Sequence, residues 1–428
     1  MFTKSLAAAA VAAMATANYD VEFTSNHLFN TKNPAFVNMG KFHGSDEDFL
    51  LVSSFGAYAS GKVYIVRDIK DAVVNSDVSD LKPTLLDTPS FKWPNNIEVV
   101  PYDVFGERAI QVPDGFLVPG KKDGNVFIIR MDADDITKTT ETVQITEDKK
   151  HYFYHMGYWV DLNGDGRKDF VTARSNAKAG DGELLWLEHP AEGLDSTEKW
   201  TEHVLGNIAD VSIEVLELPE YPGEVVVFAA HFFDEAIRMH RVSKKDGSLI
   251  ASKTIDDTNI LSAYNVTMVD LNNDGNRQLL VNNHETKDAK NGIWAYEFPA
   301  DPMNDDWSRQ TIASNFHNAF SIFVPQMSPG FGYAICPKGT CKKGERQHIL
   351  IAGDGDHSAH ALYPTGDASK FEYENTIFDD AKGTVGAMCF SDLDQDGWLE
   401  VWVPNYDKDT IELYKMNESV SVPTEFLQ

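Results

Sequence analysis

The feature that most constrains the fold of this chain is an acidic turn between two apolar strands, repeated along the sequence. The repeat is clearest in three segments, Val160-DLNGDGRKDFV, Val269-DLNNDGNRQLLV and Ser391-DLDQDGWLEVWV. Their first aspartates, Asp161, Asp270 and Asp392, are 109 and 122 residues apart. Each separation corresponds to about two units of roughly 55–60 residues, so a degenerate unit is expected between each pair.

The full unit consists of four strands, of which the third alternates apolar and polar residues most clearly. Third strands are expected at Lys62-VYIV, Asn125-VFIIR, Glu183-LLWLEHP, Ala236-IRMHRV, Gly292-IWAYEFP, His360-ALYP and Thr410-IELYKM. Fourth strands are expected at Trp200-TEHVLG, Trp307-SRQTIA and Phe371-EYENTI. The units begin near residues 35, 96, 157, 212, 265, 320 and 386. The sequence therefore predicts an all-β fold, a seven-bladed β-propeller.

The last unit has no convincing fourth strand after Met416. Residues 19–29, Tyr19-DVEFTSNHLF, have the pattern of the missing strand. We expect the N-terminal strand to pair into the last blade, because a shared blade closes the ring and removes a free sheet edge. Residues 19–428 are then a single propeller domain.

The N-terminus has the pattern of a signal peptide over residues 1–18. Lys4 supplies a positive charge, an alanine-rich apolar stretch follows, and Ala15-Thr16-Ala17 resembles a cleavage site. No later run reaches the roughly 20 apolar residues that a membrane span needs. The formal net charge of −29 disfavours nucleic acid and anionic membranes as partners. We expect a secreted, extracellular monomer.

The acidic turns carry oxygen ligands at alternating positions, the pattern of a calcium-binding loop. Side chains at positions one, three, five and nine, with the position-seven carbonyl, would surround one ion. The expected ligands are Asp161, Asn163, Asp165 and Asp169; Asp270, Asn272 and Asp274; and Asp392, Asp394, Asp396 and Glu400. The second loop has Gln278 at position nine, so its site should be weaker. Oxygen-only ligands favour Ca²⁺ over a transition metal.

Two other interpretations of these loops remain open. An EF-hand would need helical flanks, whereas the flanks here are strands. Turns rich in Asp and Asn can also form with no metal. With their strand flanks, the repeats resemble those of the FG-GAP/VCBS superfamily, which includes the integrin α-subunit propeller. That resemblance covers essentially the whole mature chain and implies a propeller with structural calcium, but it does not specify a function.

Propeller geometry brings the ends of second strands and the starts of innermost strands to one face around the axis. The second-strand ends carry Arg174, His231, His284, Asp354, His357 and Asn405. The innermost-strand starts carry Asn96, Tyr154, His155, Tyr264 and His317. We expect these side chains to converge on an axial funnel. Among the other histidines, His189, His203 and His240 are expected to be structural, and His43, His151 and His348 to lie at the surface.

Such a cluster supplies a general base, a general acid and groups that stabilise developing negative charge. We expect catalytic roles for His155, Tyr154, His231, His284, Arg174 and His357, and substrate contacts from Asn96, Tyr264, His317, Asp354 and Asn405. The chain has no G-x-S-x-G, HExxH or phosphate-loop motif. Proton abstraction beside a carboxylate, followed by loss of a leaving group, matches these residue types.

The repeats are also similar to those of secreted fungal carbohydrate lyases of the rhamnose–glucuronate lyase type. Segments such as GELLWLEHP and WTEHVLG resemble the propeller of aldos-2-ulose dehydratases, whose cupin domains this chain has no room for. Both groups perform β-elimination on sugars. The resemblance implies a carbohydrate substrate, such as a glycan cleaved at a uronic acid, although no catalytic motif matches position by position.

Other functions are left open at this point. A glycosidase could use Asp354 with a second carboxylate. A fungal FG-GAP lectin would bind sugar between blades without chemistry, and an adhesion propeller would bind protein.

Cys336 and Cys341 are expected to pair within a short loop, whereas Cys389 lies in an apolar run. Asn265 and Asn417 match the glycosylation acceptor motif.

Overall fold

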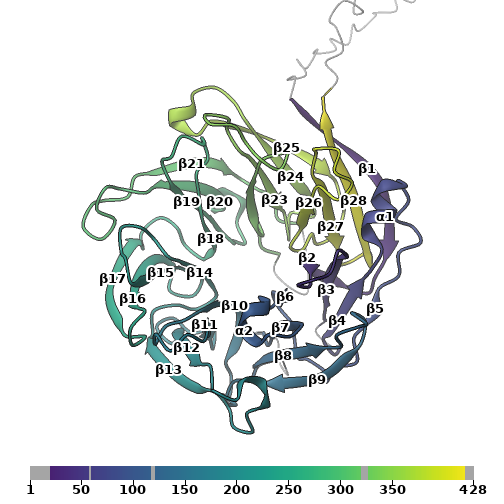
Figure 1. The fold of residues 1–428 in the computed structure, drawn as a ribbon. Coiled ribbons are helices and arrows are strands. Elements are labelled where there is room, and N and C mark those ends of the chain that lie inside the picture. The colour runs from purple at the N-terminus through teal and green to yellow at the C-terminus, as the bar shows by residue number, and fades with distance from the viewer. Residues whose placement is uncertain (1–19, 57–58, 117–120, 320–325, 420–428) are drawn as a thin grey trace, which may run out of the picture.

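The computed structural model describes residues 20–56, 59–116, 121–319 and 326–419. Within these residues the strands form seven four-stranded antiparallel sheets arranged around a central axis (Figure 1). The chain is a seven-bladed β-propeller, as its repeats predicted. The expected signal peptide, residues 1–18, lies outside the described residues.

Each blade runs from an innermost strand at the axis to an outermost strand at the rim. Blades 1–4 are β2 (Pro34–Lys41), β3 (Asp48–Ser54), β4 (Lys62–Val66) and β5 (Thr84–Leu85); β6 (Glu98–Val99), β7 (Ala109–Pro113), β8 (Val126–Met131) and β9 (Thr139–Gln144); β10 (Phe153–Val160), β11 (Asp169–Ser175), β12 (Glu183–Glu188) and β13 (Thr201–Gly206); and β14 (Ser212–Leu216), β15 (Glu224–His231), β16 (Ala236–Ser243) and β17 (Leu249–Asp256). Blades 5–7 are β18 (Ala263–Val269), β19 (Gln278–Asn283), β20 (Gly292–Glu297) and β21 (Arg309–Ser314); β22 (Gly332–Ile335), β23 (His348–Ala352), β24 (Ala359–Pro364) and β25 (Tyr373–Asp379); and β26 (Cys389–Ser391), β27 (Glu400–Asn405), β28 (Thr410–Glu418) and β1 (Val21–Asn30).

Among the residues that the structure describes, helices occur only as short connections. These are α1 (Ile69–Val74), α2 (Tyr102–Phe105) and the single 3₁₀ turns η1 (Gly193–Asp195), η2 (Asp288–Lys290) and η3 (Ala368–Lys370). None of the described helices has the length and apolar character that crossing a bilayer requires.

The expected third strands all form, because each alternates residues that pack against the two neighbouring blades. The sixth unit differs from its predicted position. Its innermost strand β22 begins at Gly332 rather than near residue 320. The start of this unit was predicted from average spacing, which cannot show that the connection after β21 is unusually long.

The ring closes through the N-terminal strand, as expected. β1 pairs antiparallel with β28, with Val21 opposite Glu418 and Asn30 opposite Thr410. At the axis the Val37 amide donates to the Ala387 carbonyl at 3.1 Å, which joins the innermost strands of blades 1 and 7. The first and last strands of the chain therefore share one sheet.

Seven hydrophobic clusters fill the seven gaps between blades. Within β3, for example, Leu50 and Val52 pack towards blade 7, whereas Phe49 and Leu51 pack towards blade 2. This alternation follows from the two-residue period of a strand buried on both faces. The core is thus a ring of similar interfaces, and Phe29 of β1 belongs to the one that closes it.

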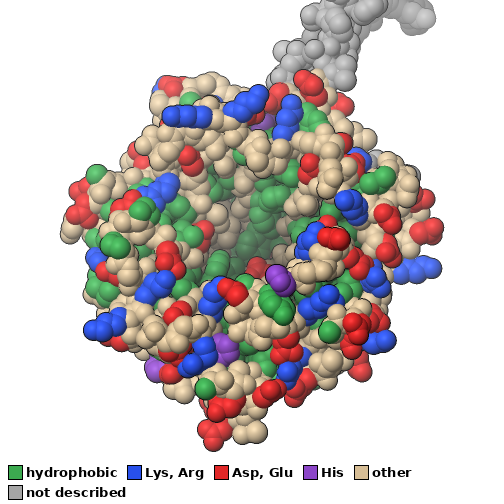
Figure 2. All heavy atoms as spheres, viewed as in Figure 1, with side chains coloured by type: hydrophobic (Ala, Val, Ile, Leu, Met, Phe, Trp, Pro, Cys, Tyr) green, Lys and Arg blue, Asp and Glu red, His purple; other side chains and the backbone are tan. Residues whose placement is uncertain are grey.

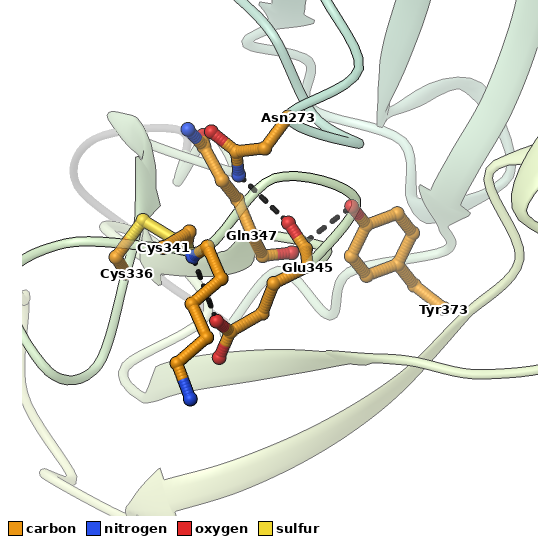
Figure 3. Close-up of a disulfide and its surroundings, with 7 residues drawn as sticks. Asn273, Cys336, Cys341, Glu345, Gln347 and Tyr373 are labelled. Atoms are coloured by element: carbon orange, nitrogen blue, oxygen red, sulfur yellow. Dashed lines mark hydrogen bonds between the residues drawn. A yellow bond between two sulfur atoms is a disulfide. The ribbon is translucent and has the colours of Figure 1, made fainter.

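A disulfide between Cys336 and Cys341 braces the turn between β22 and β23 (Figure 3). After this turn, the Asn273 side-chain amide donates to the Glu345 carbonyl at 2.7 Å, and the Gly344 amide donates to the Asn273 carbonyl at 2.9 Å. On the other side, the Leu399 amide donates to the Pro337 carbonyl at 2.9 Å. Blade 6 therefore uses a covalently closed loop to connect the acidic turns of blades 5 and 7.

The face shown in Figure 2 is hollowed at the centre of the ring, and hydrophobic side chains gather inside the hollow. Acidic and basic side chains surround it.

Of the two possible glycosylation sites, Asn265 is only 8% exposed and its amide lies 3.4 Å from the Gly332 carbonyl. Its side chain is therefore not accessible to a glycan in the folded chain.

Candidate functional site at the propeller axis

Irregularities in the innermost strands turn selected side chains towards the axis. The pairing of β10 with β11 shifts between Tyr154 and Gly157, and that of β18 with β19 shifts between Ala263 and Asn265. A bulge of this kind changes the direction in which a side chain leaves a strand, and bulges are common beside active sites. His155 and Tyr264 lie within these two shifts.

Four blades contribute rings to one axial cluster, formed by Phe36, His155, Tyr264, His284, Phe331 and Asp354. The His155 ring lies 5.6 Å from Phe36 and 6.2 Å from Tyr264, measured between centroids. It also faces Phe331 at 6.1 Å. Because Phe36, His155, Tyr264 and Phe331 belong to blades 1, 3, 5 and 6, these contacts cross the ring.

His284 stacks on Tyr264, with ring centroids 4.5 Å apart and an angle of 21° between the planes. Its Nδ1 lies 2.9 Å from the Pro329 carbonyl, which can only accept, so Nδ1 carries the proton. Nε2 is then the basic nitrogen, and it lies 3.9 Å from Oδ2 of Asp354. The Asp354 side chain is 30% exposed, which opens this pair to solvent.

The backbone around Asp354 is held in an uncommon conformation. Asp354 has φ of 52° and His357 has φ of 65°, both in the left-handed region. The Asp354 amide donates to the Val385 carbonyl of blade 7 at 3.2 Å. Non-glycine residues in this region are concentrated at functional sites, where the surrounding structure maintains them.

Burial controls the protonation of the cluster. It lowers the pKa of His155 to about 4, so this imidazole is neutral at pH 7. His155 is 4% exposed, and its Nδ1 has no hydrogen-bond partner among the described residues. Burial also raises the pKa of Asp354 and, with a further contribution from the Asp354 charge, that of Tyr264. Tyr264 therefore keeps its proton at neutral pH.

The prediction that Tyr154 and Arg174 reach the axis is wrong. The Arg174 guanidinium donates to Glu183 and to Glu202, both at 2.6 Å, and to the Tyr154 hydroxyl at 3.1 Å. Tyr154 packs in the hydrophobic cluster between blades 2 and 3. These side chains form a buried ionic network inside the blade, because strand alternation directs them away from the axis.

His231 and His317 also lie outside the axial cluster. His231 is buried within blade 4, where its Nδ1 lies 3.6 Å from Asp234 and 3.2 Å from Arg238. His317 precedes β22 by a long connection, and its side chain is 70% exposed beside Asp288. His317 was expected at the axis only because the sixth blade was predicted to begin too early.

The other expected site residues, the catalytic candidate His357 and the substrate contacts Asn405 and Asn96, lie outside the axial cluster as defined above. Asn405 donates to the Ala381 carbonyl at 2.7 Å and accepts from the Lys408 amide, which stabilises its own turn. The His357 amide donates to the Asp354 carbonyl at 3.0 Å, and its Nε2 is buried without a partner in the described part of the chain. Asn96 belongs to a separate polar group, which contains Glu98.

The acidic turn of blade 7 fits a bound cation best. Asp392, Asp394 and Glu400 each place a carboxylate oxygen within 4.8 Å of the others. Oδ1 of Asp392 and Oε1 of Glu400 are buried and have no hydrogen-bond donor among the described residues. Burial raises the pKa of Glu400 to about 7. Buried oxygens without donors are costly, and a hard cation would satisfy them. The remaining expected ligand, Asp396, accepts from the Trp398 amide.

The acidic turn of blade 3 satisfies its carboxylates internally. Both oxygens of Asp161 accept backbone amides, from Gly164 and Gly166. Both oxygens of Asp169 also accept amides, at 2.9 Å each. The other two expected ligands are held as well, since Asn163 accepts the Asp165 amide and Asp165 contacts Arg167. Each carboxylate oxygen of Asp161 and Asp169 therefore has an amide donor among the described residues.

The acidic turn of blade 5 shows what Gln278 does at position nine. Its Oε1 accepts the Leu271 amide at 2.9 Å, and its Nε2 donates to the Asn276 carbonyl at 2.9 Å. That carbonyl is the position-seven ligand of a calcium loop. Oδ1 of Asn272 is buried without a partner among the described atoms, and Asp270 and Asp274 accept backbone amides. The glutamine amide thus contacts the carbonyl that an ion would use.

Known proteins resemble this chain in fold alone. No protein-family model and no curated protein matches this sequence. Among solved structures, hydrazine synthase of Kuenenia stuttgartiensis is similar with a TM-score of 0.51 and 12% identity, over 90% of this chain and 96% of that one. The Dos1 propeller is similar with a TM-score of 0.45 and 11% identity, over 86% of this chain and 75% of its own.

Sequence reasoning missed a second polar group in the ring. Glu98 accepts hydrogen bonds from Asn96 at 2.8 Å and from Gln111 at 3.2 Å. Gln111 in turn accepts from the Trp159 indole at 2.6 Å, and Asn38 donates to Asn96 at 2.9 Å. The short strand β6 gives no sequence signal for this group, since only two residues of it pair.

Proposed function

We propose that this protein is a secreted, calcium-stabilised carbohydrate-active lyase that cleaves a glycan by β-elimination, with a uronic acid such as rhamnosyl-glucuronate at the cleavage point. The observation that carries the proposal is the pair formed by His284 and Tyr264 beside Asp354. A base, an acid and a carboxyl group lie together at the axis, where loops of several blades can position an extended substrate.

In the proposed reaction, His284 is the general base. Its Nδ1 proton is held by the Pro329 carbonyl, so Nε2 offers its lone pair to the carbon-bound proton next to the substrate carboxylate. The electron pair of that C–H bond forms a carbon–carbon double bond, and the bond from the neighbouring carbon to the glycosidic oxygen breaks. Tyr264, which stays protonated, gives its proton to the leaving oxygen.

The remaining residues of the cluster position these two groups. Tyr264 stacks on His284 and contacts His155 and Phe331, which limits movement of the phenol. Asp354, whose pKa is raised by burial, lies 3.9 Å from Nε2 of His284 and marks the side of the imidazole that the substrate approaches. Arg174 cannot bind the substrate carboxylate, since Glu183 and Glu202 hold it.

The net charge of −29 favours a substrate with few acidic groups. A single uronate within a mostly neutral glycan meets this condition, whereas a long polyanion would be repelled. The resemblance of the repeats to those of fungal carbohydrate lyases supports the same substrate class.

The test is the ultraviolet absorbance of unsaturated uronate products during incubation with a panel of glycans. His284→Gln and Tyr264→Phe should each lower the rate by a factor of about 10² or more, the usual contribution of a general acid or base. His203→Gln is the matched control, because His203 lies on the outermost strand β13 and bonds to Glu188. Its rate should equal that of the wild-type chain.

Other results would favour the alternatives. Release of sugar without the ultraviolet signal would indicate a glycosidase and overturn the elimination. Binding of several sugars per chain with no product would indicate a lectin. If His284→Gln kept the full rate of elimination, the assignment of the base would be wrong.

Calcium and secretion form part of the proposal. The donor-free oxygens of Asp392 and Glu400 support a structural Ca²⁺ in blade 7. The disulfide in blade 6 and the predicted signal peptide support an oxidising, extracellular location. Isothermal titration with Ca²⁺ and N-terminal sequencing of the exported protein test these two points.

A further inference from the structure

A cleft of about 670 Å³ lies between blades 1 and 2, at the ends of β2 and β6. We refer to it as the β2–β6 cleft; its lining includes Asn38, Lys41, His43, Glu98 and Tyr102. This volume suits a small organic ligand. None of the axial cluster residues lines the cleft, so it is a separate site.

An exposed pair of rings forms one side of the cleft. His43, on the turn after β2, stacks on Tyr102, with centroids 4.4 Å apart and 22° between the planes. Tyr102 is 42% exposed although it is a large aromatic residue. The two rings come from adjacent blades and leave an outer aromatic surface against which the apolar face of a ring-shaped ligand can pack.

The inner part of the cleft presents hydrogen-bond acceptors. Asn38 uses both amide protons, donating to Oδ1 of Asn96 at 2.9 Å and to the Ile97 carbonyl at 2.8 Å. These two acceptors fix the orientation of the amide, so its Oδ1 is available to accept. No donor to that oxygen occurs among the described residues.

The Glu98 carboxyl is held in place beside Asn38 by Asn96 and Gln111. Gln111 is itself fixed, because its oxygen accepts from Trp159. Glu98 is partly buried, and burial raises its pKa. Lys41, the cation in the lining, lies 3.6 Å from Asp48.

We infer that the β2–β6 cleft binds a neutral sugar ring, with Tyr102 and His43 against the apolar face and with Asn38 and Glu98 accepting hydrogen bonds from the hydroxyl groups. Hydroxyls supply the donors that this acceptor-rich site lacks. An anionic ligand would be repelled by the Glu98 carboxylate and by the net negative charge of the protein. Lys41 offsets little of this repulsion, because its ammonium group already lies 3.6 Å from the Asp48 carboxylate. The site goes beyond the proposed lyase chemistry and does not depend on it.

The experiment measures binding to the full chain by ligand-observed saturation-transfer NMR and by titration calorimetry. The neutral probes are methyl α-D-glucopyranoside and L-rhamnose, and the charged probes are D-glucuronate and choline. A neutral probe should bind, and it should shift the imidazole resonances of His43. Tyr102→Ala and His43→Ala should each lower the affinity about tenfold, as expected for a lost aromatic contact.

Both variants change exposed side chains, so the fold should be retained. Tyr221→Ala is the matched control, because Tyr221 lies on the corresponding turn of blade 4, where Arg241 covers its ring at 4.1 Å. The control should bind the neutral probes as the wild-type chain does. His284→Gln should also bind them normally, which separates this cleft from the axial cluster.

Four results would overturn the inference. These are the failure of both neutral probes to bind, a larger shift of the His43 imidazole resonances by choline or D-glucuronate than by either neutral sugar, unchanged affinity in both aromatic variants, and loss of binding in His284→Gln. Failure of the elimination assay has no bearing on this binding measurement, so the two proposals fail independently.

Discussion

Exchanging the position-nine residues of two acidic turns should transfer the calcium response from one blade to another. In blade 7, Glu400 accepts the Leu393 amide through Oε2 and keeps a buried Oε1 without a donor. In blade 5, Gln278 accepts the equivalent Leu271 amide and donates its NH₂ group to the position-seven carbonyl. Glu and Gln differ by one atom and one charge. Glu400 leaves a free oxygen that can bind an ion, whereas the NH₂ group of Gln278 occupies the equivalent position.

The size of the effect follows from ligand linkage. An ion present at about 100 times its Kd stabilises the folded state by about 2.7 kcal/mol. An unfolding entropy of roughly 2.1 cal/mol/K per residue, over the roughly 400 residues from 20 to 419, gives about 0.8 kcal/mol/K. The wild-type chain should therefore melt about 3 °C higher in excess Ca²⁺ than in a chelator.

Glu400→Gln should abolish this difference without lowering the melting temperature in the chelator, since the amide oxygen can still accept the Leu393 amide while the donor-free carboxylate oxygen is removed. Gln278→Glu should add a second calcium-dependent increase, because the donor-free Oδ1 of Asn272 is already in place. Calorimetric melting with and without chelator measures both. A full calcium response in Glu400→Gln, or none in the wild-type chain, would refute the reasoning.

Two further predictions concern stability, and a third concerns calcium binding. Because the folded-state pKa of His155 is about 4, below its unfolded value, His155 contributes stability that is complete above about pH 6.5 and is lost as the pH falls towards 4. The decrease in unfolding free energy from pH 7 to pH 5, measured in urea, should be about 2 kcal/mol smaller in His155→Phe; an unchanged pH dependence would contradict this. Phe29→Ala removes a side chain that is 1% exposed and should cost about 3–5 kcal/mol in the same assay, and a cost below about 1 kcal/mol would show that β1 does not close the ring. Cys336→Ser should weaken calcium binding to blade 7 in calorimetry, since its turn bonds to Leu399; an unchanged affinity would argue against that connection.

The architecture could be predicted from the sequence because recognisable turns and strands mark the blade repeats. The acidic turns mark every second blade, and the third strands alternate clearly, so both the fold and the closing strand were predicted correctly. The sixth blade was misplaced because the connection between β21 and β22 is longer than the average spacing of the units predicts.

The axial site could be predicted only in part, because bulges in the innermost strands change which side chains face the axis. His155, Tyr264, His284 and Asp354 do meet at the axis, but a two-residue period cannot show where a bulge shifts the direction of a strand. Tyr154 precedes His155 by one residue and faces a different environment. His348 was expected at the surface, yet it is 4% exposed and lies 3.2 Å from Asp20 of the N-terminal segment.

The pairing of β1 with β28 has a consequence for how the chain matures. Residues 21–30 are synthesised well before their partner, residues 410–418. During synthesis the N-terminal strand must wait, with its backbone unpaired, while six blades assemble behind it. A nascent or truncated chain that lacks residues 410–418 therefore exposes two open edges at once, which makes it a ready substrate for chaperones and a source of aggregation.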